Sequence, residues 1–124
     1  MATVLLADDH PTMRLLVRRS LEEAGYDVIE AVDGLQAFEL AIEHRPTLIF
    51  LDWQMPGLTG LDVCKRLRVL PEFASTAVIM MTGFAELAMI QIARDAGADD
   101  VLVKPVEPQV LLACTERVLQ PEAA

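Results

Sequence analysis

Five short apolar runs alternate with five stretches of helical periodicity, and this alternation constrains the fold more than any other feature of the sequence. The apolar runs occupy residues 3–7, 27–32, 47–51, 77–81 and 101–103, and the helical stretches residues 11–24, 35–43, 60–70, 85–96 and 107–119. Short connections between alternating strands and helices imply right-handed crossovers, so a parallel sheet with helices on both faces is expected. The pattern predicts a single doubly wound (βα)5 domain of the α/β class, with a core over about residues 3–119 and a tail at 120–124.

The composition narrows the function classes. A net charge of -9 argues against a basic groove for nucleic acid, and no apolar run approaches the ~18 residues of a membrane span. The N-terminus reaches acidic residues too soon for a signal peptide. Cys64 and Cys114 stand far apart and form neither a ligand pair nor a disulfide framework. We expect a cytoplasmic protein that binds no membrane and no nucleic acid directly.

Polar side chains follow four of the five predicted strands. Asp8 and Asp9 follow the first strand, Asp52 the third, Thr82 the fourth and Lys104 the fifth. Each of these residues alone has an ordinary explanation as a turn former, a helix cap or a solvated lysine. In open parallel sheets, however, ligands bind at the carboxyl ends of the strands. The five residues together therefore predict one site at one edge of the sheet.

The expected chemistry of this edge is phosphoryl transfer. Three close carboxylates raise one another's pKa, and one lysine offsets only part of their charge. A hard cation such as Mg2+ (or Mn2+) would offset the rest. The metal, Lys104 and the Thr82 hydroxyl could then bind phosphoryl oxygens. Because a carboxylate can attack phosphorus, Asp52 at the end of a central strand is the expected nucleophile.

Four motifs, in order at the strand ends, resemble the receiver domain of the two-component response regulator family. They are "LLADD", "LDWQMPGLTG", "MMTG" and "AGADDVLVKP", and the resemblance spans residues 4–119. It implies a CheY-like, flavodoxin-like sheet with strand order 2-1-3-4-5. It also implies a phosphoprotein of a phosphorelay, a signalling protein and not an enzyme in the usual sense.

The resemblance assigns a role to each phosphoryl-binding residue. Asp52 would accept the phosphoryl group from a histidine of a sensor histidine kinase or a histidine phosphotransfer protein. Thr82 and Lys104 would bind phosphoryl oxygens, and the bond between Lys104 and Pro105 would be cis. Phosphorylation would then shift an equilibrium between inactive and active forms.

The metal ligands are also implied by the resemblance. Asp9 and Asp52 would ligate Mg2+ directly, joined by the main-chain carbonyl of Gln54, and Asp8 would act chiefly through water. Gln54 and Phe84 occupy positions that tune hydrolysis of the phosphate in the family. Phe84 offers no group to orient a water, so a fairly long-lived aspartyl phosphate is expected.

The predicted output face comprises the fourth helix, the fifth strand and the fifth helix, which would bind a downstream target or a second copy of the chain. Val101 stands where many relatives carry an aromatic switch residue, and a valine is too small and stiff for that movement. Switching is therefore expected through the loop and fourth helix. Met89, Ile92, Val110 and Cys114 are expected to face outward with Val101 as one apolar patch; the alternative is that they pack inward.

Three arginines on the first helix, Arg14, Arg18 and Arg19, form a basic cluster in an acidic chain. The resemblance favours docking of the phosphodonor there, and a solvated helix face is the alternative.

Two other functions compete with the receiver interpretation. A haloacid-dehalogenase-like phosphatase would use Asp8 as nucleophile, but histidine stands at position 10, where that class needs a second aspartate. A receiver-like scaffold that is never phosphorylated is disfavoured because no site residue is missing. A dinucleotide-binding domain is excluded by the lack of a GxGxxG motif after the first strand.

Overall fold

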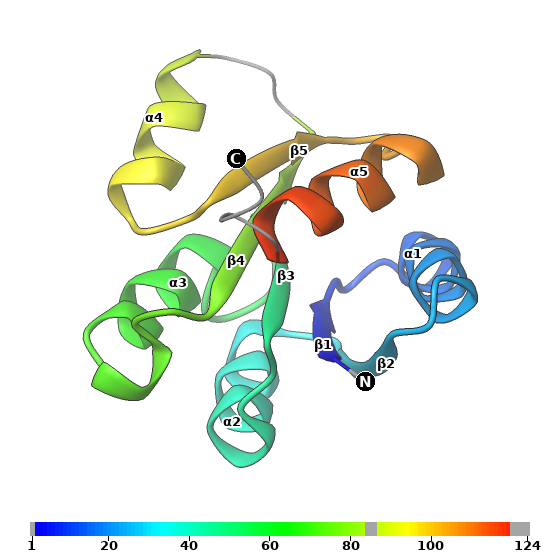
Figure 1. The fold of residues 1–124 in the computed structure, drawn as a ribbon. Coiled ribbons are helices and arrows are strands. Elements are labelled where there is room, and N and C mark those ends of the chain that lie inside the picture. The colour runs from blue at the N-terminus through cyan, green and yellow to red at the C-terminus, as the bar shows by residue number, and fades with distance from the viewer. Residues whose placement is uncertain (1, 84–86, 120–124) are drawn as a thin grey trace.

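The computed structural model describes residues 2–83 and 87–119. Strands and helices alternate along the chain (Figure 1). The strands are β1 (Thr3–Ala7), β2 (Asp27–Ala31), β3 (Leu48–Asp52), β4 (Ala77–Thr82) and β5 (Asp100–Val103). The helices are α1 (Pro11–Glu23), α2 (Gly34–His44), α3 (Gly60–Arg68), α4 (Leu87–Asp95) and α5 (Pro108–Leu119), with a short 3-10 helix η1 (Pro71–Phe73). None of the helices in this described part combines the length and apolar character of a membrane span.

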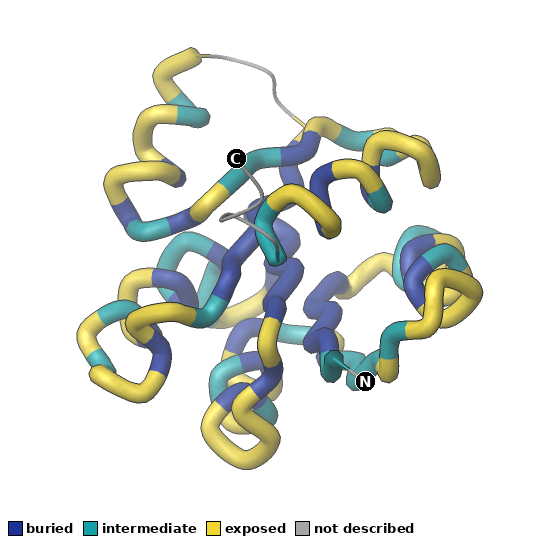
Figure 2. The backbone as a smooth tube through the Cα atoms, in the orientation of Figure 1, coloured by how far each residue is buried: buried dark blue, intermediate teal, exposed yellow. Residues whose placement is uncertain are grey.

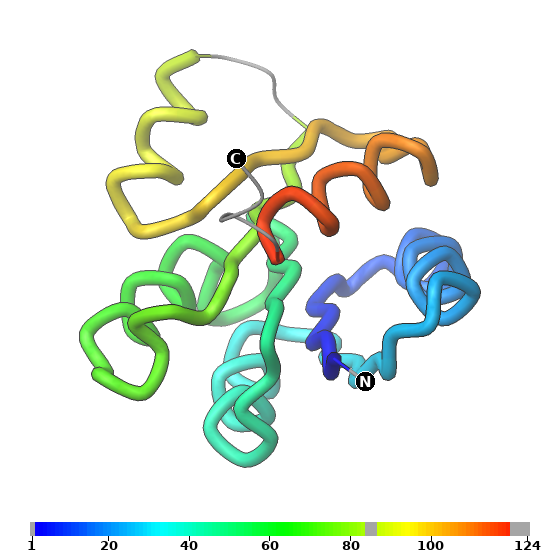
Figure 3. Tube along the Cα trace, in the orientation of Figure 1, coloured from blue at the N-terminus to red at the C-terminus, as the bar shows by residue number. Residues whose placement is uncertain are grey.

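The five strands form one parallel sheet in the order β2-β1-β3-β4-β5. The chain runs from β1 outward to β2, returns past β1 to β3 and continues to β4 and β5 (Figure 3). Helices α1 and α5 cover one face of the sheet, and α2, α3 and α4 cover the other (Figure 1). This confirms the predicted fold class and strand order. The strand order reverses between β1 and β3, and ligands bind at this switch point in such sheets.

The core divides into two clusters, one on each face of the sheet. Leu5 and Ile49 pack on the side of α2, α3 and α4, while Leu6 and Phe50 pack on the side of α1 and α5. Every residue of β3 and β4 is buried, and these central strands form the dark interior of Figure 2. Burial on both faces explains why their sequences are continuous apolar runs instead of alternating ones.

Several element boundaries differ from the predicted ones. β3 and β4 each extend one residue further, so that Asp52 and Thr82 belong to the sheet ladder. α3 ends at Arg68 and not at residue 70, because the chain turns extended at Leu70 before Pro71 begins η1. α5 begins at Pro108, one residue late, since proline suits a first helical turn. The predicted start of the fourth helix at residue 85 lies outside the described residues.

Two glycines allow unusually close contacts at helix starts. A Cβ added to Gly34, the first residue of α2, would lie 1.9 Å from the carbonyl oxygen of Leu58. A Cβ added to Gly60, the first residue of α3, would lie 2.3 Å from the carbonyl oxygen of Asp52. The Gly60 N–H also donates to the Trp53 carbonyl at 3.0 Å. Helix α3 is thus held directly against the end of β3.

Gly34→Ala is expected to lower the free energy of unfolding by about 2–3 kcal/mol, because backbone must shift to admit the methyl group. Gly83→Ala is the matched control, since no atom lies within 4 Å of the added Cβ there; its effect should stay within about 0.5 kcal/mol. Urea denaturation measures both variants. Equal midpoints for the two would contradict the contact at Gly34.

Candidate functional site

The carboxyl ends of four strands deliver the predicted side chains to one edge of the sheet. Asp8 follows β1, Asp52 ends β3, Thr82 ends β4, and Lys104 follows β5. Thr82 pairs with Val103 in the ladder, and the Lys104 N–H donates to the Thr82 carbonyl at 2.7 Å. Parallel register therefore fixes the depth at which each side chain leaves the sheet.

The three carboxylates converge. One oxygen from each of Asp8, Asp9 and Asp52 lies within 4.8 Å of the other two. Lys104 Nζ lies 3.1 Å from Asp52 Oδ2 and 3.3 Å from Asp8 Oδ2. Asp8 is fully buried and Asp52 is 5% exposed, whereas Asp9 is exposed. A single ammonium thus serves two buried carboxylates, and the cluster keeps a negative charge.

Burial raises the pKa of Asp52 from its ordinary value near 3.8 to about 6, and the neighbouring Asp8 raises it too, although Lys104 lowers it. The carboxylate is therefore ionised at pH 7, as a nucleophile must be. Its ionised form is nevertheless costly in this setting, so a bound cation would be favourable.

The residues at this edge fit a magnesium ion. All three side chains offer oxygen, the ligand that this hard cation prefers. Asp8 Oδ2 is buried and accepts no hydrogen bond within the described part of the chain; its ion-pair contact is Lys104. A hollow of about 360 Å³ gives access to the cluster and is lined by Asp9, Trp53, Gln54, Met55, Pro56 and Thr59.

Of the remaining predicted site residues, Thr82 and Gln54 lie at this edge of the sheet. Thr82 is 1% exposed at the end of β4, and the Lys104–Pro105 peptide bond is cis, as the resemblance implies. Gln54 is exposed beside the hollow, and its main-chain carbonyl stays a predicted ligand. Phe84, invoked for the lifetime of the phosphate, lies outside the described residues.

Two of the three arginines on α1 have intramolecular partners that the sequence did not reveal. Arg14 pairs with Glu30 at 2.9 Å, and Arg18 pairs with both Glu30 and Glu22. Arg19 is exposed. The cluster is therefore not a freely solvated basic patch. A sequence signal existed, because Glu30 lies in the strand predicted to neighbour the first one and has the opposite charge.

The expected apolar patch around α4, β5 and α5 is present only in part. Ile92 and Val110 are 46% and 51% exposed, as predicted. Met89 and Val101 are half-buried and pack against the core. The prediction that Cys114 faces outward is wrong, since it is 2% exposed and belongs to the core cluster under α5.

An ion-paired aspartate explains the inward turn of Cys114. The thiol donates to Asp100 Oδ2 at 3.3 Å, and the same carboxylate pairs with Arg117 and lies 3.9 Å from Arg94. Burial alone would raise the pKa of Asp100, but the Val101 N–H, Cys114 and Arg117 lower it overall. Burial and Asp100 raise the pKa of Cys114 to about 12, so the thiol stays protonated.

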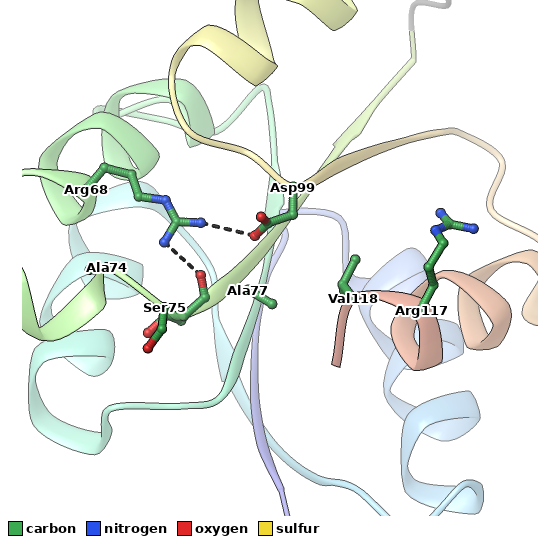
Figure 4. A pocket seen from close by; sticks show the side chains of 8 residues that line it. Arg68, Ala74, Ser75, Ala77, Asp99, Arg117 and Val118 are labelled. Carbon is green, nitrogen blue, oxygen red and sulfur yellow. Dashed lines mark hydrogen bonds and ion pairs between the residues drawn. The ribbon is translucent and has the colours of Figure 1, made fainter. Parts of the chain in front are cut away.

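A second hollow, of about 390 Å³, lies at the opposite edge of the sheet, where β4 and β5 begin (Figure 4). Its wall includes Arg68, whose guanidinium donates to the carbonyls of Phe73, Thr76 and Gly97 and pairs with Asp99 at 3.1 Å. These donors are committed to holding α3 against the starts of β4 and β5. The residues of this hollow therefore have a structural role, and the hollow lies at the opposite edge of the sheet from the Asp8, Asp9 and Asp52 cluster.

Comparisons with known proteins agree with this geometry. The profile of the response regulator receiver domain matches residues 4–116. The chain is 37% identical to chemotaxis protein CheY1 of Helicobacter pylori over 94% of its length and 95% of that protein. It is 36% identical to sporulation initiation phosphotransferase F of Bacillus subtilis, over 84% and 82%.

Several relatives are about twice as long as this chain. The DNA-binding dual master transcriptional regulator RpaA of Synechocystis is 39% identical over 97% of the chain, but the chain spans only 50% of RpaA. Among solved structures, chemotaxis response regulator CheY4 of Vibrio cholerae superposes with a TM-score of 0.91 at 36% identity, covering 95% of this chain and 98% of that one.

Proposed function

The chain belongs to the response regulator receiver domain family, and we propose on this premise that it accepts a phosphoryl group on Asp52 in a reaction that requires Mg2+ (or Mn2+). One observation carries the proposal. The Oδ2 atom of buried Asp52 lies 3.1 Å from Lys104 Nζ, and one carboxylate oxygen of Asp52 lies within 4.8 Å of an oxygen of Asp8 and of Asp9. The donor is a phosphohistidine of a sensor histidine kinase or a histidine phosphotransfer protein.

The reaction exchanges one bond to phosphorus for another. A carboxylate oxygen of Asp52 forms the new P–O bond while the P–N bond to the donor histidine breaks, and its electron pair leaves with the imidazole. Lys104 neutralises a phosphoryl oxygen, and the Thr82 hydroxyl donates a hydrogen bond to another. Asp8, Asp9, Asp52 and the Gln54 carbonyl would hold the metal, which when bound would offset negative charge on the phosphoryl oxygens.

The output of the proposed reaction is protein binding. Phosphorylation shifts an equilibrium between two forms, and the face of α4, β5 and α5 binds a downstream target or a second copy of the chain. The exposed side chains of Ile92 and Val110 support this choice of face. A net charge of -9 argues against direct contact of this chain with nucleic acid.

Incubation of the protein with a small acyl phosphate tests the proposal. With Mg2+ present, incorporation should approach one equivalent per chain, and it should fall to background when the metal is chelated. Reduction of the aspartyl phosphate with borohydride converts the modified residue into homoserine, and mass spectrometry of the peptides should locate that change at position 52.

The competing functions give different outcomes in the same experiment. A phosphatase that uses Asp8 would release phosphate continuously, and the release would persist in Asp52→Asn but stop in Asp8→Asn. A scaffold would incorporate no phosphate with or without Mg2+. Either result, or a label on a residue other than Asp52, would overturn the proposal.

A further inference from the structure

Arg14 connects helix α1 to the acidic edge of the sheet. Its Nη1 donates to the main-chain carbonyl of Asp8 at 2.9 Å, and its Nε donates to Glu30 Oε1 at 2.9 Å. The side chain is only 18% exposed. A guanidinium can hold two acceptors in a fixed relative geometry because its donors form a rigid fork.

The carbonyl that Arg14 contacts belongs to the peptide unit joining Asp8 to Asp9. The rest of Asp8 is also fixed: its N–H donates to the Ala31 carbonyl at 3.1 Å, and its Oδ1 accepts from the His10 N–H at 2.9 Å. The orientation of this peptide sets the direction in which both side chains leave the backbone. Both carboxylates belong to the cluster of three described above.

Glu30 balances the charge of Arg14. Its second carboxylate oxygen pairs with Arg18, which also pairs with Glu22 at 3.1 Å. Arg14 therefore acts on the cluster through the backbone of Asp8, and its ion pair is with Glu30. Its contribution to the site is geometric and does not depend on long-range attraction.

We propose that Arg14 is a positioning residue for the metal site, which holds the Asp8–Asp9 peptide so that both carboxylates can face one cation. This inference rests on the proposed function, because the cation is the one that function requires. Residues that orient metal ligands from outside typically change metal affinity by about 10–100-fold when they are removed.

The test compares two arginines that share the partner Glu30. Arg14→Met removes the contact to Asp8, whereas Arg18→Met removes the same charge and a pair to Glu30 without touching Asp8. Mg2+ affinity is followed by the fluorescence of Trp53, the only tryptophan, which follows Asp52 and lines the same hollow as Asp9. Mn2+ affinity is followed independently by the electron paramagnetic resonance signal of the free ion.

Arg14→Met should weaken the binding of both ions by about 10-fold, and Arg18→Met should change it by less than about twofold, since it touches no atom of the Asp8–Asp9 peptide. Arg14→Lys should recover part of the loss, because an ammonium can still donate to the Asp8 carbonyl but cannot fork to Glu30. Urea denaturation of each variant reports folding separately from metal affinity.

Equal affinities for Arg14→Met and the wild type would overturn the inference, as would equal losses in the two methionine variants. A different result would contradict the proposed function alone. A wild type that binds Mg2+ in an Arg14-dependent way but takes no phosphate from acyl phosphate would contradict phosphoryl transfer and support the positioning role.

Discussion

Asp52→Asn is expected to reduce phosphate incorporation from about one equivalent per chain to less than about 0.01, because a neutral amide oxygen is a far weaker nucleophile than a carboxylate. Incorporation is measured with acyl phosphate and Mg2+, as for the wild type. Asp9→Asn serves as a comparison. It removes a proposed metal ligand but keeps the nucleophile, so it should slow incorporation without abolishing it. Full incorporation in Asp52→Asn would mean that another residue accepts the phosphoryl group.

The same substitution is expected to stabilise the fold by about 1–3 kcal/mol at pH 7 in the absence of divalent metal. Burial raises the pKa of Asp52 from near 3.8 to about 6. An acid with a raised pKa in the folded state destabilises the fold as it ionises, so wild-type stability is lost as pH rises from about 4 through 6. Asparagine is uncharged throughout this range and avoids the loss.

Urea denaturation of wild type and Asp52→Asn between pH 4 and pH 7 measures this effect. The stability gap should be largest at pH 7 and narrow toward pH 4, and saturating Mg2+ should reduce it by stabilising the ionised wild type. A gap independent of pH would contradict the assigned cause.

Lys104→Met is expected to destabilise the metal-free protein by about 3–5 kcal/mol at pH 7, because it leaves the buried carboxylates of Asp8 and Asp52 without their shared cation. The loss should be smaller at pH 5, since removing the ammonium raises the pKa of Asp52 further and the group protonates. The rate of phosphate incorporation should fall by about 100-fold, as a phosphoryl oxygen loses its counter-charge.

Lys65→Met is the control for Lys104→Met, because it removes the other lysine of the chain from an exposed position on α3. Its stability and its rate of phosphate incorporation should stay near those of the wild type. The experiment measures urea unfolding of both variants at pH 5 and pH 7, with and without Mg2+. Similar losses for the two lysines, or a loss at Lys104 that is as large at pH 5 as at pH 7, would contradict the shared ion pair.

The fold, and the meeting of the site side chains at one edge of the sheet, could be predicted from the sequence because both follow from the order of strands and helices along the chain. The switch between strand and helix periodicity sets the element order, and parallel strands bring their carboxyl ends together. Asp8, Asp52, Thr82 and Lys104 needed no knowledge of side-chain packing to be assigned to one edge. Their burial and the raised pKa of Asp52 required the structure, because both depend on surrounding atoms.

The contradicted prediction for Cys114 and the unpredicted ion pairs of two arginines both concern residues whose environment depends on partners elsewhere in the chain. Cys114 turns inward to meet Asp100, which comes from a strand fourteen residues earlier in the chain. Arg14 and Arg18 pair with Glu30 on β2. A helix rotated by a few tens of degrees exchanges exposed for buried positions, and periodicity cannot fix that rotation to better than one residue. How the protein switches with Val101 in place of an aromatic residue stays a hypothesis.

The contact between Gly60 and Asp52 has a consequence for where the molecule can deform. With no side chain between them, the start of α3 packs directly against the end of β3, and the Gly60 N–H donates to the Trp53 carbonyl. Because of this contact, we expect that phosphorylation of Asp52 does not slide α3 along the sheet. The displacement should instead appear in α4 and β5, with α3 as a stationary reference.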